Sequence, residues 1–144
     1  MRIDGEWYEC DDGAVRPIIR AEVLAMTGFW EPALLLVDTG ADGTVFSPLI
    51  VEALGFPFGP MRRQLGGIGG VCESAGIETR IRFSDDRGRK IAFRSEYAAV
   101  METGALDISV LGRDILDMFA VIVDRPGRVV ALVGQRHRYT IEHA

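Results

Sequence analysis

Short apolar segments in this chain alternate with clusters of turn-forming residues. Segments of this length, rich in Ile, Val, Leu and Phe and bounded by Gly, Pro and Asp, are typical of β-strands. The pattern predicts strands at Ile18–Ala25, Ala33–Val37, Ile77–Phe83, Lys90–Tyr97, Phe119–Asp124 and Arg128–Val133.

The breaks between these segments are short enough to be hairpin turns. Thr27-Gly28, Asp85–Gly88 and Arg125–Gly127 each separate two consecutive predicted strands. In the last break, Pro126 followed by Gly127 suits the two central positions of a type II turn. Many short strands joined by tight turns predict an all-β sandwich or barrel.

Helical patterns are confined to two short segments. Ser47 followed by Pro48 reads as a helix N-cap with proline in the first helical position, and Gly55 ends that segment. The second segment, Gly112–Met118, follows an apolar run and contains no helix breaker. We therefore expect one or two short helices beside the strands.

Length and composition fit one soluble domain. The chain has 144 residues, of which 48% are hydrophobic and 26% charged, as in ordinary globular proteins. We predict an N-terminal arm (residues 1–15, with Met1–Asp12 acidic and irregular), a domain over residues 16–135 and a polar tail over 136–144. No apolar run is long enough to span a membrane and no signal peptide is recognisable, so we expect a cytoplasmic protein with reduced Cys10 and Cys72.

The charge pattern and the few histidines exclude several functions. A net charge of −5 gives no overall attraction to nucleic acid. The local basic cluster from Arg80 to Arg94 reads as the solvated face of a hairpin. His137 and His143 lie in the polar tail, so we expect no metal site and no Ser/His/Asp or Cys/His catalytic set.

The segment Leu34–Asp42 carries the clearest chemical signal. An apolar run leads directly into Asp38-Thr39-Gly40. A carboxylate at the end of a buried strand is costly unless its charge is shared or hydrogen-bonded, and perturbed carboxylates often perform acid–base chemistry. Gly40 permits a tight turn that brings main chain close to the carboxylate, and the Thr39 hydroxyl can brace the loop.

Two further segments are candidates for the same functional site. Leu65–Val71 has four glycines around Ile68, a composition suited to a mobile hairpin tip that closes over a ligand. In Val110–Leu116, Arg113 stands where an apolar strand enters a short helix. Asp42 is the obvious carboxylate for Arg113 to pair with.

Each segment also has a simpler interpretation. Asp38-Thr39-Gly40 could be an ordinary turn after a strand, the glycine-rich segment a flexible surface loop, and Arg113 a solvated residue at a helix terminus. A calcium loop beginning at Asp38 is excluded because Gly40 and Leu49 occupy positions where ligands are required. The glycine-rich segment lacks the Lys-Ser/Thr of a phosphate-binding loop.

Taken together, these motifs resemble the retropepsin-like aspartic proteases. That family has an apolar strand leading into Asp-Thr-Gly-Ala-Asp, a glycine-rich flap, and an apolar pair with Gly-Arg-Asp or Gly-Arg-Asn before a helix. This chain has them at Val37–Thr44, Gly66–Gly70 and Leu111–Leu116, in the family's order. Arg16-Pro17 resembles the start of the family's first long strand. The resemblance, from about Arg16 to Met118, implies a closed acid-protease-type β-barrel with a flap hairpin.

The resemblance implies roles for the Asp-Thr-Gly loop. Asp38 becomes the catalytic carboxylate, and Thr39 and Gly40 support the loop, Thr39 through bonds across a dimer. Gly40, Ala41 and Asp42 line the cleft and bind substrate main chain. The family needs no metal and no organic cofactor for this reaction.

Further site residues follow from the same resemblance. Arg113 anchors Asp42, and Arg16 reaches Asp42 of a partner subunit. The flap contacts the substrate through Gly67, Ile68 and Gly69, with Ile68 at its tip.

The chemistry requires two carboxylates around one water, one to accept its proton and one to protonate the scissile carbonyl. Such a pair shares a proton and titrates as a unit, the case for which aspartic proteases are the standard illustration. Asp-Thr-Gly occurs once in this chain and Asp-Ser-Gly does not occur. We therefore expect a homodimeric aspartic endopeptidase acting on a peptide or protein substrate, with Asp38 from each subunit.

A second hypothesis from another class stays open at this point. The chain could be a non-catalytic peptide-binding or dimerisation module that retains the fold. The chain also departs from retroviral members, which end soon after the helix with a strand that interleaves between subunits. Here Phe119–Val133 continues beyond the helix, and a hairpin at Val121–Leu132 is the candidate replacement for that interleaved sheet.

Overall fold

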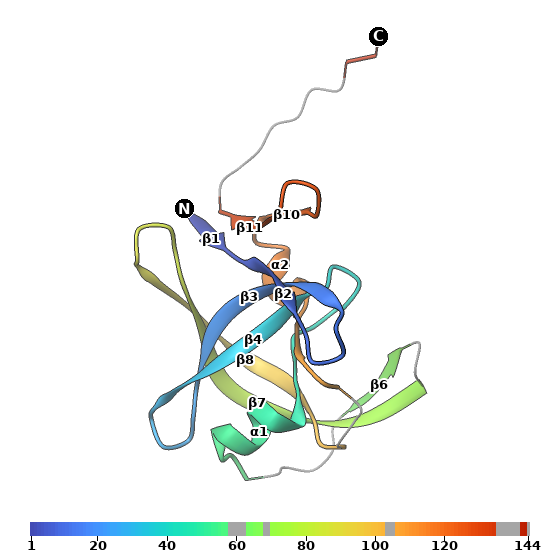
Figure 1. Ribbon diagram of the computed structural model, residues 1–144. Helices are drawn as coiled ribbons and strands as arrows, with labels where there is room; N and C mark the ends of the chain where they lie inside the picture. Colours follow the sequence, from blue (N-terminus) through green and yellow to red (C-terminus); the bar gives the residue numbers. More distant parts are fainter. Residues whose placement is uncertain (58–62, 68–69, 103–105, 135–141, 144) are drawn as a thin grey trace.

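The computed structural model describes residues 1–57, 63–67, 70–102, 106–134 and 142–143. Most of them lie in β-strands, which confirms the predicted class, and two short helices accompany the strands. Both helices and most of the strands, all except β5 and β9, are labelled in Figure 1. None of the helices in the described ranges is long and apolar enough to cross a membrane.

The larger of two sheets has eight strands. They are β2 (Glu6–Glu9), β3 (Val15–Leu24), β4 (Trp30–Val37), β5 (Val45–Phe46), β6 (Arg63–Gly67), β7 (Gly70–Ser84), β8 (Lys90–Val100) and β9 (Ser109–Leu111). Their order in the sheet is β2-β3-β4-β9-β5-β8-β7-β6, and β3 pairs in addition with β7 through Glu22 and Val23.

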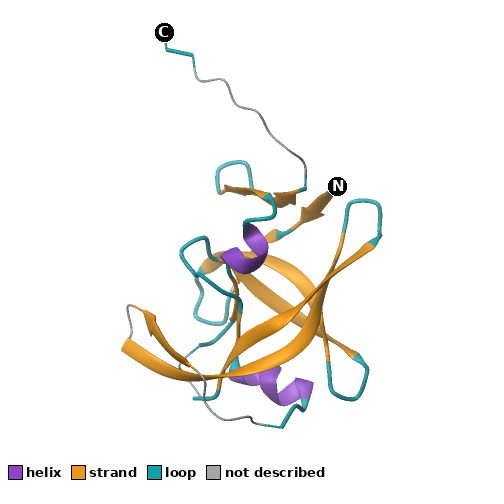
Figure 2. Ribbon diagram, turned by 180° about the vertical axis from the view of Figure 1, so that it is seen from behind, coloured by secondary structure: helices purple, strands orange, loops and turns teal. Residues whose placement is uncertain are grey.

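The smaller sheet has three strands in the order β1-β11-β10. These are β1 (Arg2–Asp4), β10 (Ala120–Asp124) and β11 (Val129–Val133). The helices are α1 (Pro48–Leu54) and α2 (Arg113–Leu116). Figures 1 and 2 show α1 and α2 at opposite ends of the larger sheet, with α2 beneath the smaller sheet.

Alternating burial along the strands builds the core. In β4, Ala33, Leu35 and Val37 are buried while their neighbours are more exposed, as the two-residue period of a strand requires. Two strands from the smaller sheet add Ile3, Val130 and Leu132 to the same hydrophobic cluster. Both sheets therefore share one core. Because Asp38 directly follows β4, the buried face of this strand fixes the position of Asp38.

The N-terminal segment differs from the prediction of an irregular arm. β1 pairs with β11 and β2 pairs with β3, both antiparallel. Trp7 holds this segment down, because its indole N–H donates to the carbonyl of Asp124 at 3.0 Å and it lies 5.0 Å from the Arg125 guanidinium. The sequence of this segment alternates acidic and apolar residues, and such a pattern does not reveal partners so far away along the chain.

The predicted helix starts and stops are close to those observed. Gly55 has φ 68°, a left-handed conformation that glycine adopts at little cost, and it ends α1 as expected. Ser47 stands at the N-cap but its side chain makes no capping hydrogen bond. α2 ends at Leu116, two residues before Met118, the predicted end.

The predicted type II turn at Arg125–Gly127 is wrong. Such a turn needs a positive φ at Gly127, whereas the positive φ in this turn is at Arg128, 55°. Arg128 N–H donates to Arg125 O at 3.2 Å, and Gly127 N–H donates to the Asp124 carboxylate at 2.9 Å. The side chain of Asp124 thus binds the turn backbone and favours a different geometry.

Candidate active site

Asp38 follows the last residue of β4, and the surrounding backbone fixes its position. Its N–H donates to Leu111 O at 3.2 Å, which continues the parallel pairing of β4 with β9. Its carboxylate Oδ1 accepts the N–H of Gly40 at 2.9 Å, and its carbonyl accepts the N–H of Ala41 at 3.2 Å. The turn therefore holds a half-exposed carboxylate at the end of a buried strand.

Gly40 stands where a side chain would crowd this carboxylate. A Cβ at this position would lie 3.2 Å from Asp38 Oδ1, tighter than an ordinary van der Waals contact. Glycine lets the backbone approach the carboxylate closely enough for the hydrogen bond. Thr39, beside it, is exposed in the same turn.

The start of α2 binds the other side of the loop. The backbone N–H of Arg113 donates to Ala41 O at 2.9 Å, and that of Asp114 donates to Asp42 O at 3.2 Å. The Arg113 guanidinium also donates to the Asp42 carboxylate, so the structure brings this predicted ion pair together. Because both side chains are largely exposed, the pair orients the loop more than it stabilises the fold.

A buried bridge that the sequence does not predict joins the two loops. Thr44 is 1% exposed. Its hydroxyl accepts the N–H of Gly112 at 3.1 Å and donates to the Asp114 carboxylate at 2.7 Å. A Cβ on Gly112 would lie 2.3 Å from the carbonyl C and O of Gly43, so the two backbones meet here.

A second buried hydroxyl pair lies behind the bridge. Ser109 Oγ accepts the backbone N–H of Ser47 at 2.9 Å and lies 3.3 Å from Ser47 Oγ. Both serines are buried. A signal was available in the sequence, because Thr44, Ser47 and Ser109 are polar residues within apolar stretches. Their partners could not be identified from the sequence, because each of these bonds joins positions more than 60 residues apart.

Arg16 has a partner within its own chain. The register of β3 with β4 pairs Ile18 with Leu36, which places Arg16 beside Asp38 if continued. The guanidinium of Arg16 donates to both carboxylate oxygens of Asp12, at 2.9 and 2.7 Å. This pairing lowers the pKa of Asp12 to about 2 and raises the pKa of Arg16. The predicted contact of Arg16 with a partner subunit stays a prediction.

The glycine-rich segment lies within a β-hairpin. β6 pairs antiparallel with β7, and Gly67 is opposite Gly70 in this register. In Figure 1 the hairpin projects from the larger sheet at the right of the view, away from α1. Ile68 and Gly69, the predicted flap tip, lie outside the described residues.

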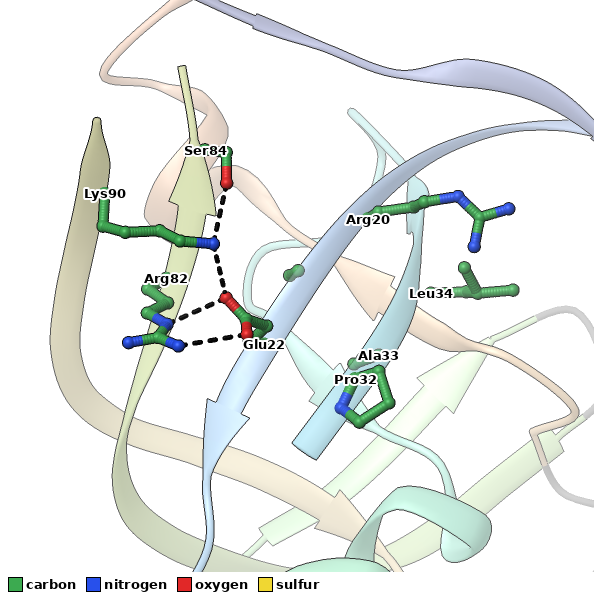
Figure 3. A pocket seen from close by; sticks show the side chains of 9 residues that line it. Arg20, Glu22, Pro32, Ala33, Leu34, Arg82, Ser84 and Lys90 are labelled. Carbon is green, nitrogen blue, oxygen red and sulfur yellow. Dashed lines mark hydrogen bonds and ion pairs between the residues drawn. The ribbon is translucent and has the colours of Figure 1, made fainter. Parts of the chain in front are cut away.

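The part of the chain that the structure describes offers no alternative site of clear chemistry. Within the described ranges, no group of three or more His, Cys, Asp and Glu side chains is placed to hold a metal ion. A hollow of about 470 Å³ lies over β3, β4, β7 and β8, apart from the Asp38 loop (Figure 3). It contains Glu22, which accepts hydrogen bonds from Arg82 and Lys90. These bonds lower the pKa of Glu22 to about 2.

Comparisons with known proteins point to one group. A family model described as aspartyl protease matches residues 25–115, which include the Asp38 loop and Arg113. The EIAV protease complexed with the inhibitor HBY-793 is similar in structure, with 25% identity, a TM-score of 0.51 and coverage of 71% of this chain and 86% of that chain.

A second solved structure is similar over more of the chain. It is a retropepsin-like aspartic protease from Rickettsia conorii, with 21% identity, a TM-score of 0.56 and coverage of 92% of this chain and 88% of that chain. No curated protein sequence matches the chain.

Proposed function

This chain belongs to the aspartyl protease family and is an aspartic-type endopeptidase of the retropepsin-like kind, and from that premise we propose that it works as a homodimer with one Asp38 from each subunit. The observation that carries the proposal is the Asp38 loop. One carboxylate stands at the end of a buried strand, held by Gly40 and braced by α2. The sequence supplies Asp-Thr-Gly once, so a second carboxylate must come from a second copy.

In the proposed mechanism the two carboxylates share one proton and bind one water between them. The ionised carboxylate removes a proton from the water, whose oxygen attacks the carbonyl carbon of the scissile peptide. The protonated carboxylate donates to the carbonyl oxygen, and the resulting tetrahedral intermediate breaks down with protonation of the leaving nitrogen.

The other predicted site residues take supporting roles in this proposal. Asp42, fixed by Arg113, and the backbone of Gly40 and Ala41 offer groups for an extended peptide main chain. The β6–β7 hairpin that includes Gly67 is proposed to close over the substrate and exclude water. The additional pairing of β3 with β7 supports a closed barrel as the scaffold. The cytoplasmic location stays a prediction.

Subunit mixing with an Asp38→Asn variant tests the proposal. The side-chain oxygen of Asn can still accept the Gly40 N–H, so the variant should fold but lack activity against casein. Added to a fixed amount of wild-type protein and allowed to exchange, an equal amount of the variant should lower activity to about half, and a ninefold excess to about a tenth.

A matched control separates catalysis from dilution of subunits. A Lys90→Ala variant, altered in the hollow of Figure 3, should form fully active mixed dimers, so the total activity should rise in proportion to the added protein. If excess Asp38→Asn protein leaves wild-type activity unchanged although the subunits exchange, the two-subunit dyad is refuted. Activity retained by Asp38→Asn alone would refute Asp38 as the catalytic residue and favour a different site on this fold.

A further inference from the structure

The register of the larger sheet brings an arginine next to the Asp38 loop. β3 and β4 pair antiparallel, and Ile18 lies opposite Leu36. Asp38 keeps the course of β4, because its N–H donates to Leu111 O in line with the pairing of β4 and β9. Continued by two residues on each strand, the register places Arg16, within β3, opposite Asp38. Residues directly opposite each other in such a pair have Cβ atoms about 4.5–5.5 Å apart on one face of the sheet.

The guanidinium of Arg16 nevertheless binds a different carboxylate. Its two terminal nitrogens donate to the two oxygens of Asp12, at 2.9 and 2.7 Å. Asp12 is itself fixed by the turn between β2 and β3, because its Oδ1 also accepts the N–H of Ala14 at 2.9 Å. A two-pronged pair between arginine and a carboxylate is strong and sets the direction of the guanidinium. The carboxylate of Asp38 accepts the N–H of Gly40 instead.

Resting on the proposed catalytic role of Asp38, we propose that Asp12 is a positioning residue that holds the Arg16 guanidinium away from the catalytic carboxylate. Without the charge of Asp12, the nearest carboxylate across the sheet from Arg16 is Asp38. A direct pair between them would favour the ionised form of Asp38 and would occupy an oxygen that must bind water. Carboxylates paired in this way would lose the shared proton that the reaction needs to protonate the scissile carbonyl.

The other polar groups around Arg16 do not replace Asp12 in this role. Tyr8 lies opposite Arg16 in β2, and the Cys10 side chain interacts with its guanidinium, but neither is a carboxylate. On the other side of the catalytic loop, Asp42 already has the guanidinium of Arg113 as its partner. Control of the Arg16 side chain therefore depends on one carboxylate of its own subunit.

The pair of Asp12 and Arg16 persists in acid. Binding to Arg16 lowers the pKa of Asp12 to about 2, and the same contact raises the pKa of Arg16. An aspartate with an ordinary pKa near ~4 would lose its charge within the acidic range in which a carboxylate dyad exchanges its proton. Asp12 instead stays charged over most of that range and keeps the guanidinium occupied.

An Asp12→Asn variant tests the inference with little change of shape. Asparagine retains an oxygen for the Ala14 N–H, so the turn should persist, but its uncharged amide cannot hold the guanidinium. Activity against casein at about pH 5 should fall at least about tenfold, and the pH optimum should move down by about 0.5–1 unit. Asp11→Asn is the matched control, because the exposed Asp11 side chain makes no hydrogen bond or ion pair with the part of the chain that the structure describes. Its activity should stay within about twofold of the wild type.

Removing the arginine as well separates positioning from a purely structural role. In an Arg16→Gln background, Asp12→Asn should change the activity by less than about twofold and leave the pH optimum in place, because no cation remains to bind Asp38. Comparison within this background also cancels any effect of Arg16 on the association of subunits. An equal loss of activity in both backgrounds overturns the proposal. So does an Asp12→Asn variant with the activity and pH profile of the wild type.

A measurement that needs no catalysis keeps this inference separate from the proposed function. The carboxyl carbon of Asp38, identified in ¹³C NMR spectra by its loss in Asp38→Asn, reports the protonation of this group directly. The midpoint of its titration should lie at least about 0.5 pH unit lower in Asp12→Asn than in Asp11→Asn, and Arg16→Gln should abolish the difference. That result in a protein without activity upholds the role of Asp12 and refutes only the proposed function. Equal midpoints in an active protein overturn the role of Asp12 alone.

Discussion

Replacing Gly112 with alanine should damage the active site through one steric contact. The new Cβ would lie 2.3 Å from Gly43 C and O and 2.8 Å from Gly43 Cα. All three are backbone atoms, so no flexible side chain can move away. The φ of Gly112 is −97°, which alanine adopts readily, so the backbone conformation itself adds no strain.

The magnitude follows from two effects. Forcing an extra methyl group into a packed site costs about 1–3 kcal/mol. Separating the two loops also weakens the bond from Gly112 N–H to Thr44 Oγ1, and an unsatisfied buried N–H costs about 1–3 kcal/mol. We expect the free energy of unfolding to fall by about 3 kcal/mol in total, which for a chain of 144 residues lowers Tm by about 6–12 °C.

Gly43→Ala is the matched control, because it alters the other glycine of the same contact. A Cβ on Gly43 meets no atom within 4 Å, and its φ is not positive. Alanine there should be neutral or should stabilise by up to about 1 kcal/mol by restricting the unfolded chain. The Tm of each alanine variant is measured by calorimetry in the Asp38→Asn background, which avoids self-cleavage. The kcat/KM of each alanine variant is measured with Asp38 intact, at a temperature well below both Tm values. Equal Tm values for the two alanine variants would refute the close approach.

Two further predictions concern the buried bridge and an ion-pair cluster. Thr44→Val should lower the free energy of unfolding by about 1–3 kcal/mol in urea titrations, because the Gly112 N–H loses its acceptor. Thr44→Ser keeps a hydroxyl and should retain most of that stability. A valine variant as stable as the serine variant would contradict the bridge. Glu22, 31% exposed and with its pKa lowered from 4.5 to about 2 by Arg82 and Lys90, adds stability that is present above pH 4.5 and lost as the pH falls toward 2. In the Asp38→Asn background, Glu22→Gln should therefore show a smaller fall in urea midpoint between pH 5 and pH 3 than Asp38→Asn alone, and an equal fall would show that Glu22 does not titrate in this window.

The sequence predicts the parts of the fold that depend on local pattern. The strands around Leu35 and Ile81 and the helix between Pro48 and Gly55 follow from the spacing of apolar residues, turn formers and caps. The all-β class and the aspartyl protease family, inferred from Asp38-Thr39-Gly40 together with Gly112-Arg113-Asp114, are confirmed.

The rest of the fold depends on contacts between distant positions. β1 becomes a strand because β11 lies next to it, and nothing in Arg2–Asp4 by itself indicates that partner. The buried bridge needs Thr44 and Gly112, which are 68 positions apart, to meet. The pairing of Arg16 with Asp12 depends on the tight turn between β2 and β3. From the sequence, this turn is predicted to be part of an irregular arm.

The pairing of β1 with β11 of the same chain has a kinetic consequence. A subunit completes both of its sheets from its own residues, so its folding is a first-order process that does not wait for another molecule. Any association of finished subunits is a separate second-order step. Under the proposed two-subunit mechanism, a newly synthesised chain is thus fully folded and still latent, and dilution silences the enzyme without denaturing it.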